Sequence, residues 1–135
     1  MALIQWNTSL SVNIAEIDTQ HQRLISMINE LNDAMLQGRG KDVLGKIIAG
    51  LVSYTATHFA TEEKYFDRHG YPASNAHKQE HRDFTAKVSE FKQGFDEGRL
   101  GLSVSVMNFL GDWLRNHIKG SDMDYSPFLT GKGVR

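Results

Sequence analysis

The chain of 135 residues contains no cysteine, only two prolines, no cluster of basic residues and no long uninterrupted apolar run. The absence of cysteine excludes disulfides, thiol catalysis, zinc fingers and cysteine-ligated iron–sulfur clusters. Any metal must therefore be held by histidines and carboxylates. Because 15 basic and 16 acidic residues leave a formal net charge of −1, the sequence predicts neither nucleic-acid binding nor a polybasic membrane patch.

Two further absences concern localisation. No basic residue precedes Arg23, so the N-terminal segment does not resemble a signal peptide. The longest uncharged stretch, 47–61, contains His58 and several hydroxyl side chains, and it falls short of the ~18 apolar residues that a spanning helix needs. We therefore expect a cytoplasmic protein without membrane insertion.

The composition is typical of one globular domain. Hydrophobic residues make up 40% of the chain and charged residues 23%, which are ordinary values for a folded protein. The length matches the common domain size of about 100–150 residues. Because the sequence shows no repeat, linker or low-complexity segment, we expect a single domain over residues 1–135.

Apolar side chains recur at helical spacing in four blocks. The spacing i, i+3, i+4, i+7 indicates amphipathic helices, and no comparable length shows the alternation of a strand. Gly70 and Pro72 are expected to end the second helix. In the third block, Phe84, Val88, Phe91 and Phe95 are expected to be core residues. The predicted helices span 18–38, 42–69, 74–95 and 103–119.

Short connections between these helices favour antiparallel neighbours. The sequence therefore predicts an all-α, up-down-up-down four-helix bundle. An N-terminal arm (1–17) precedes the bundle, and a short C-terminal tail (120–135) follows it.

Five of the six histidines lie on the apolar faces of these helices, together with one glutamate. Side chains four residues apart on a helix point the same way. His58 with Glu62, and His77 with His81, are therefore expected to present pairs of side chains to one point. The other two predicted helices contribute one histidine each, His21 and His117.

Asp122 is a candidate for the same cluster, but its spacing is unfavourable. It lies five residues after His117, which is ~140° around a straight α-helix and would point the carboxylate away. Gly120 lies between the two and allows a π-bulge or a frayed turn that brings Asp122 back inward. If Asp122 points outward, Asp124 is the alternative carboxylate.

A single histidine on an apolar face is usually a hydrogen-bonded core residue. Five histidines with an inward glutamate are different, because each unpaired buried polar group costs about 1–3 kcal/mol and apolar neighbours supply no partner. A shared metal supplies one, and seven candidate ligands exceed the four of a structural zinc, which favours two ions. Three nearby residues are interpreted otherwise: Asp18 as a helix cap, Glu63 as solvated, and His69 as a residue of a helix C-terminus.

These motifs resemble those of the hemerythrin family, in particular the bacteriohemerythrins. The resemblance covers nearly the whole chain and is carried by Trp6, Ile17-Asp18-Thr19-Gln20-His21, His58-Phe59-x-x-Glu62-Glu63, Tyr71-Pro72, His77-Lys-x-x-His81 and Trp113-Leu114-x-x-His117-Ile118-x-x-x-Asp122. One departure is Asn13, where such sequences often have glycine.

The resemblance implies two iron ions joined by a bridging oxo or hydroxo group. One iron would be held by His77, His81 and His117, and the other by His21 and His58. Glu62 and Asp122 would bridge the pair. This arrangement leaves one coordination position open, on the iron with two histidines, where dioxygen can bind.

The expected dioxygen pocket is apolar. Leu24 and Leu114 each lie one helical turn from a candidate ligand and on the same face of the helix. The resemblance suggests that Phe59 also lines the pocket.

The resemblance implies reversible dioxygen binding for storage, transport or delivery, without catalytic residues. The partner is then O2, with an O2-consuming enzyme as its recipient. The alternative is an O2 or redox sensor module. We expect a stand-alone carrier, because the family motifs extend close to both ends and leave no room for an output domain. A di-iron oxidase ranks third, because no further general acid or base occupies an inward position.

Overall fold

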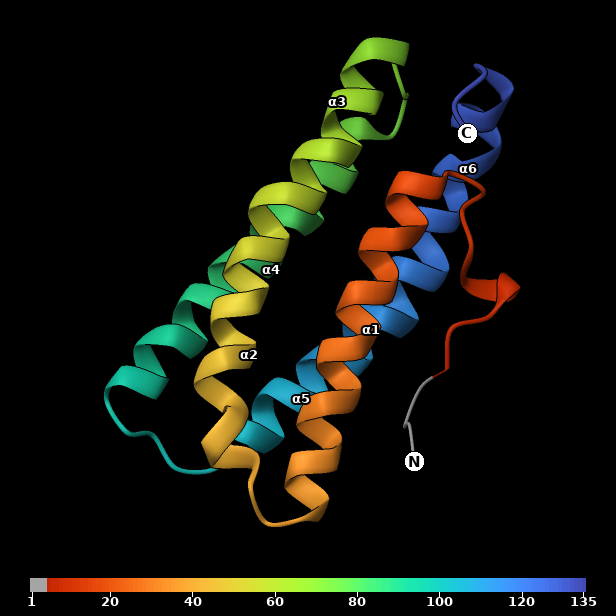
Figure 1. Cartoon of the computed structure of the whole chain (residues 1–135). Coiled ribbons are helices and arrows are strands. Elements are labelled where there is room, and N and C mark those ends of the chain that lie inside the picture. Colours follow the sequence, from red (N-terminus) through yellow and green to blue (C-terminus); the bar gives the residue numbers. More distant parts are fainter. Residues whose placement is uncertain (1–4) are drawn as a thin grey trace.

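The computed structural model describes residues 5–135, and these form helices and connecting turns with no strand. Residues 1–4 of the expected arm lie outside the described part. The helices form four long segments, which run side by side and alternate in direction (Figure 1). They are α1 (Ala15–Leu36); α2 (Gly40–Tyr54) continued by η2 (Thr55–Phe59) and α3 (Ala60–His69); α4 (Ser74–Asp96); and α5 (Leu102–Trp113) continued by η3 (Leu114–Asp122) and α6 (Met123–Gly131). The predicted four-helix bundle is confirmed.

Left-handed backbone conformations mark two boundaries of these helices. Gly70 has φ 67° and ends α3, where the sequence predicts the stop. Asn13 has φ 62° just before α1 begins. This conformation favours glycine and is tolerated by asparagine, so the departure at Asn13 is compatible with the backbone at this position.

The predicted C-terminal tail is largely helical, so this prediction was wrong. α5, η3 and α6 follow one another without a break as far as Gly131. Gly120, expected to end the helix, lies inside η3. The helix continues because its next turns bury apolar side chains in a small second core, made of Val12, Ile14, Ile17, Phe66, Tyr125 and Leu129.

The N-terminal arm is fastened to this second core. Ser126 Oγ of α6 donates a hydrogen bond of 2.6 Å to the carbonyl oxygen of Val12. Asp18, predicted to cap a helix, instead holds the arm onto α1, since its carboxylate accepts from Val12 N at 2.9 Å and from Ser11 Oγ at 2.5 Å. The arm therefore covers one end of the bundle.

A larger core fills the rest of the bundle. Phe84, Val88 and Phe91 are buried in it, as predicted. Phe95 is 39% exposed, so its assignment to the core was wrong. It lies near the end of α4 and against Gly45 of α2, where a Cβ atom would be 2.8 Å from Phe95 Cζ.

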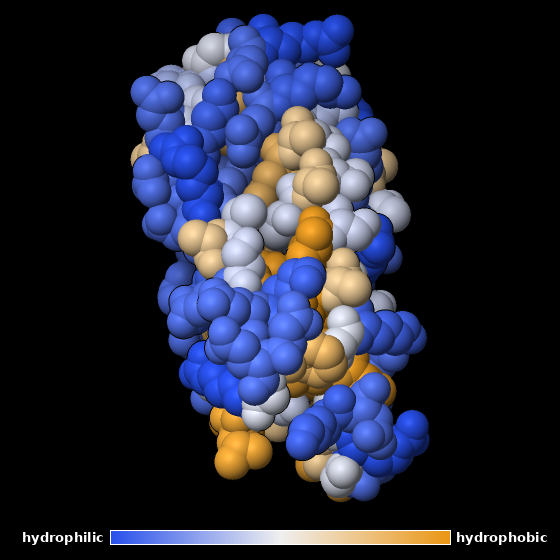
Figure 2. Space-filling model, turned by 90° about the vertical axis from the view of Figure 1, so that its left-hand side faces the viewer, coloured by the Kyte–Doolittle hydropathy of each residue, from blue (hydrophilic) through white to orange (hydrophobic). Residues whose placement is uncertain are grey.

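One face of the bundle carries apolar surface between hydrophilic flanks (Figure 2). Among the described residues of α2 and α4, the exposed large apolar side chains are Val52 and Phe95. The helical stretch Gly40–His69 is long and apolar enough to cross a membrane by length and composition alone. Its inner face, however, carries the buried His58 and Glu62 into the bundle, as expected of a core helix.

Candidate metal centre

The structure brings all seven predicted ligand side chains together inside the bundle, and each is at most 2% exposed. They form two groups that share Glu62. Within each group, one possible ligand atom from every residue lies within 4.8 Å of the others. The first group is Glu62, His77, His81 and His117, and the second is His21, His58, Glu62 and Asp122.

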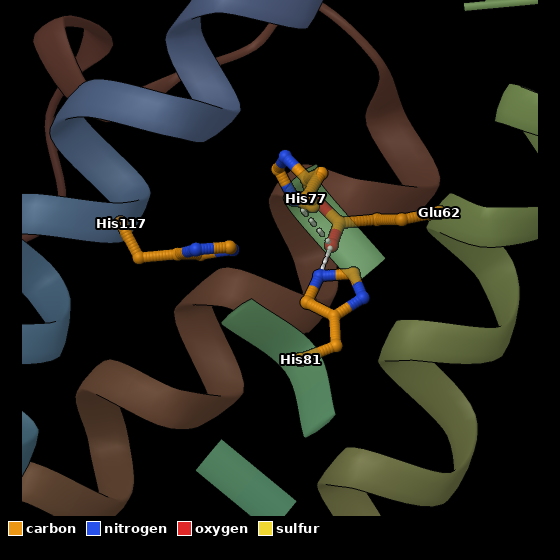
Figure 3. A group of neighbouring side chains, drawn as sticks. All are labelled: Glu62, His77, His81 and His117. Atoms are coloured by element: carbon orange, nitrogen blue, oxygen red, sulfur yellow. Dashed lines mark ion pairs between the residues drawn. The ribbon is translucent and has the colours of Figure 1, made fainter. Parts of the chain in front are cut away.

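The side chains of the first group point toward one another from three segments, α3, α4 and η3 (Figure 3). Oε1 of Glu62 lies 2.9 Å from His81 Nε2 and 3.7 Å from His77 Nε2. In the second group, His21 Nε2 and His58 Nε2 are only 3.1 Å apart. Two imidazole nitrogens that face each other so closely share one proton or one cation between them.

Asp122 joins the two groups. Its Oδ1 lies 2.9 Å from His77 Nε2 and 3.0 Å from His117 Nε2, whereas its Oδ2 lies 3.0 Å from His21 Nε2. The two oxygens of one carboxylate therefore face different histidine groups, which is the arrangement of a bridging ligand. Asp124, the alternative, is exposed.

A π-helix places Asp122 in this position. η3 spans Leu114–Asp122 as a π-helix, and the hydrogen bonds of a π-helix join residues five apart. His117 and Asp122, five apart, therefore come to the same side of the helix, as the predicted π-bulge requires. A second π-helix, η2, includes His58 and Phe59, and nothing in the spacing of the sequence predicted it.

The donor atoms fit a pair of cations. Although these atoms lie close to one another, six inward-facing atoms have no hydrogen-bond partner within the described part of the chain: the Nε2 atoms of His77, His81 and His117, Oε1 of Glu62, and both oxygens of Asp122. Buried polar atoms without partners are costly. Imidazole nitrogens and carboxylate oxygens together suit transition metals such as iron or zinc.

Charge in the metal-free site favours binding of cations. Burial acts to raise the pKa of Glu62, but the imidazoles of His58, His77 and His81 outweigh it and hold this pKa well below its usual range. The pKa of Asp122 is also lowered, because His117 and His21 outweigh burial and the charge of Glu62. Burial lowers the pKa of His58, which favours the neutral form that binds metal.

Three polar side chains hold the outer nitrogens of the histidines. His58 Nδ1 lies 2.6 Å from Gln20 Oε1, His81 Nδ1 lies 2.9 Å from Glu63 Oε2, and His117 Nδ1 lies 2.9 Å from Glu80 Oε1. Such contacts fix the ring orientation and make the inner nitrogen the ligand.

Sequence reasoning missed these three partners and took Glu63 for a solvated residue. Each is adjacent in sequence to a candidate ligand but contacts a histidine on another segment of the bundle. Gln20 precedes His21, Glu63 follows Glu62, and Glu80 precedes His81. The sequence signal that could have identified these partners is a polar residue directly before or after a candidate ligand.

Aromatic rings stack face to face on three of the histidines. Phe59 stacks on His81 with ring centroids 3.8 Å apart, Trp113 stacks on His117 at 3.8 Å, and Tyr54 stacks on His58 at 4.8 Å. All three predicted pocket residues are buried: Leu24, Phe59 and Leu114. The surroundings of the site are therefore mostly apolar, and the polar exceptions include the outer partners of the histidines, two tyrosine hydroxyls and the buried indole nitrogen of Trp113.

Comparison with known proteins identifies relatives of similar length. The family model of the hemerythrin HHE cation binding domain matches residues 12–129. A bacteriohemerythrin of Stenotrophomonas maltophilia is 38% identical over 93% of this chain and 81% of its own length. One from Methylococcus capsulatus is 31% identical over 96% of this chain and 99% of its own. The crystal structure of a wild-type hemerythrin superposes with a TM-score of 0.84 at 31% identity, covering 96% of this chain and 99% of that one.

Proposed function

Since this chain belongs to the hemerythrin family, we propose that it binds dioxygen reversibly at a non-haem di-iron centre, for storage, transport or delivery. The observation that carries the proposal is the position of Asp122, whose two oxygens face two separate histidine groups. Because each oxygen faces a different histidine group, this carboxylate suits a bridge between two ions better than binding of a single ion.

The proposed ligands follow from the two groups. His77, His81 and His117 would hold one iron and His21 and His58 the other. Glu62 and Asp122 would bridge the two irons. When bound, the irons and their oxo or hydroxo bridge supply the coordination position and the electrons for reversible dioxygen binding.

The protein itself makes the two metal positions unequal, orients the histidine rings and excludes water from the site. One group has three histidines and the other two, so an iron held by His21 and His58 would keep a position for an exogenous ligand. Gln20, Glu63 and Glu80 hold the outer nitrogens of three histidines and so fix which nitrogen faces the metals.

The apolar pocket residues help to keep dioxygen binding reversible. Leu24, Phe59 and Leu114 are buried, with at most 5% of each side chain exposed. Apolar walls would keep water and protons away from bound dioxygen. If the ligand left as peroxide instead, the irons would remain oxidised and could not bind dioxygen again. Among the residues that line this site, we assign none the role of a catalytic acid or base.

Iron content together with the response to oxygen pressure tests the proposal. We expect about two irons per chain and a visible spectrum that changes in air and returns under reduced O2 pressure, without net consumption of reductant. Consumption of O2 and reductant together would indicate an oxidase instead, and one iron per chain would contradict the di-iron centre.

A matched pair of variants tests the ligand assignment. Replacement of His81 by Ala should remove metal, since His81 Nε2 faces Glu62. His69→Ala should retain it, because His69 lies in the last turn of α3 and belongs to neither ligand group. Equal iron content in the two variants would show that the assignment is wrong.

A further inference from the structure

Tyr54 places a hydroxyl group in the core that has no hydrogen-bond partner among residues 5–135. The side chain is 1% exposed, and its Oη is fully buried and unpaired. The next residue, Thr55, has its hydroxyl satisfied by the carbonyl of Val52 at 2.8 Å. An unpaired buried hydroxyl is costly, and a phenylalanine at position 54 would fill nearly the same volume without this cost. The hydroxyl therefore indicates a partner that the described part of the chain does not supply.

The position of the Tyr54 ring suggests where that partner binds. The ring stacks on His58, with centroids 4.8 Å apart and an interplanar angle of 17°. It also packs edge-on against Phe59, at 6.0 Å. His58 belongs to the group with two histidines, the side on which the proposed centre has its open position, and Phe59 is a predicted residue of the dioxygen pocket.

The other buried tyrosine of the site offers a contrast. The hydroxyl of Tyr125 is already used, because it donates to Oε2 of Glu62. Both tyrosines are buried, and burial raises the pKa of each hydroxyl well above its usual range. Both therefore remain neutral donors, but only the hydroxyl of Tyr54 is free to donate to a molecule that enters the site.

We propose that Tyr54 is a ligand-binding residue, whose hydroxyl donates a hydrogen bond to the small exogenous ligand bound on the side of His21 and His58. The inference rests on the proposed function and deepens it, because it names a polar group that determines affinity in an otherwise apolar pocket. The ligand class is a small molecule or anion with an exposed acceptor atom, such as dioxygen or azide.

The experiment uses the iron-loaded protein and its Tyr54→Phe variant. Azide is the probe, since it binds ferric iron and accepts hydrogen bonds. A neutral hydrogen bond lost from the complex should weaken azide binding about fivefold to tenfold, measured by absorbance titration of the oxidised protein. The infrared stretch of bound azide should also shift, and dioxygen should dissociate faster by a similar factor.

Two controls separate this role from a structural one. Tyr65→Phe removes a hydroxyl that contacts Glu16 on the protein surface and should leave azide binding unchanged. Thermal unfolding of metal-free Tyr54→Phe should occur at the same temperature as in the parent or higher, because no hydrogen bond within the protein is lost. Azide affinity within twofold of the parent, with an unshifted infrared stretch, would overturn the inference.

Iron content distinguishes failure of this inference from failure of the proposed function. If the parent protein holds two irons and binds azide, and the Tyr54→Phe variant binds azide equally well, only the role of Tyr54 is overturned. A parent protein without iron overturns both.

Discussion

The hydroxyl of Tyr125 donates a hydrogen bond to Oε2 of Glu62, and so joins α6 to α3 across 63 residues of sequence. The other oxygen of this carboxylate, Oε1, lies 3.3 Å from His58 Nε2 and 2.9 Å from His81 Nε2. Tyr125 therefore fixes the rotation of the carboxylate that both ligand groups share. The C-terminal helix is thereby part of the support of the site.

Replacement of Tyr125 by Phe should loosen the metals without unfolding the chain. Loss of a contact to a ligand typically costs about 10–100-fold in metal affinity, so we expect iron to pass to a chelator at least about tenfold faster. Stopped-flow absorbance measures this rate. Tyr71→Phe is the control, because Tyr71 packs against the same second core and belongs to neither ligand group; equal rates for the two variants would contradict the role of Tyr125.

The helices and six of the seven inward side chains could be predicted because both depend on local periodicity. Asp122 is the exception, since its inward position depends on the π-helix η3. His58 with Glu62, and His77 with His81, are four apart, so the helical repeat alone places each pair on one face. The apolar residues between them identify that face as the interior.

The remaining parts of the site depend on information that local periodicity does not carry. Gln20, Glu63 and Glu80 contact histidines on other segments, so their roles depend on how helices lie next to each other. Tyr125 was missed because the helix was expected to end before it. The π-helix η2 shifts hydrogen bonds by one residue, a change that leaves the apolar pattern almost unaltered.

Asp122 and Asp124 provide a direct test of the bridge. Asp122→Ala should remove or labilise iron, because it deletes both oxygens that face the histidine groups. Asp124→Ala should leave both irons bound, since this side chain is exposed. Iron per chain after dialysis measures the difference, and the reverse result would assign the bridge to Asp124.

Leu114→Ala should accelerate oxidation of the site. The substitution removes a buried side chain next to the metal ligands and should cost about 2–5 kcal/mol of stability. It also opens a path for water, so the spectrum of the oxygenated protein should disappear faster than in the parent. Leu31→Ala is the matched control, because Leu31 is fully buried but lies ten residues after His21, about 15 Å along α1.

The rate at which the oxygenated spectrum decays in the two variants distinguishes a general loss of fold stability from a specific loss of protection against water. If both leucine variants oxidise at the rate of the parent, Leu114 is an ordinary core residue. If both oxidise equally fast, the effect arises from general loosening of the bundle.

The metal-free protein should lose stability as the pH rises above neutrality. Burial acts to lower the pKa of His77, but the nearby carboxylates of Asp122 and Glu62 outweigh it and raise the pKa to about 10, from 6.5 in a free side chain. Below pH 6.5 the folded and unfolded states both hold this proton, so its stabilising effect is complete. Between pH 6.5 and about 10 only the folded state holds it, and the free energy of unfolding falls.

Urea denaturation of the metal-free protein at the two ends of this pH range measures the effect. His77→Gln should show a smaller decline than the parent, because glutamine has no proton to lose. An identical decline in both proteins would assign the pH dependence to other groups.

The π-helix η3 holds one residue more between His117 and Asp122 than an α-helix needs to bring both side chains to one side. Five residues along a π-helix and four along an α-helix each turn the chain by little more than one full circle. Deletion of one residue, for example Lys119, should therefore restore α-helical hydrogen bonding and keep Asp122 and Tyr125 turned inward. Insertion of one residue would instead turn every later side chain by about 100°, which would move Asp122 from between the histidine groups and separate Tyr125 from Glu62. Relatives that keep the metal centre should therefore tolerate the loss of one residue in this segment better than the gain of one.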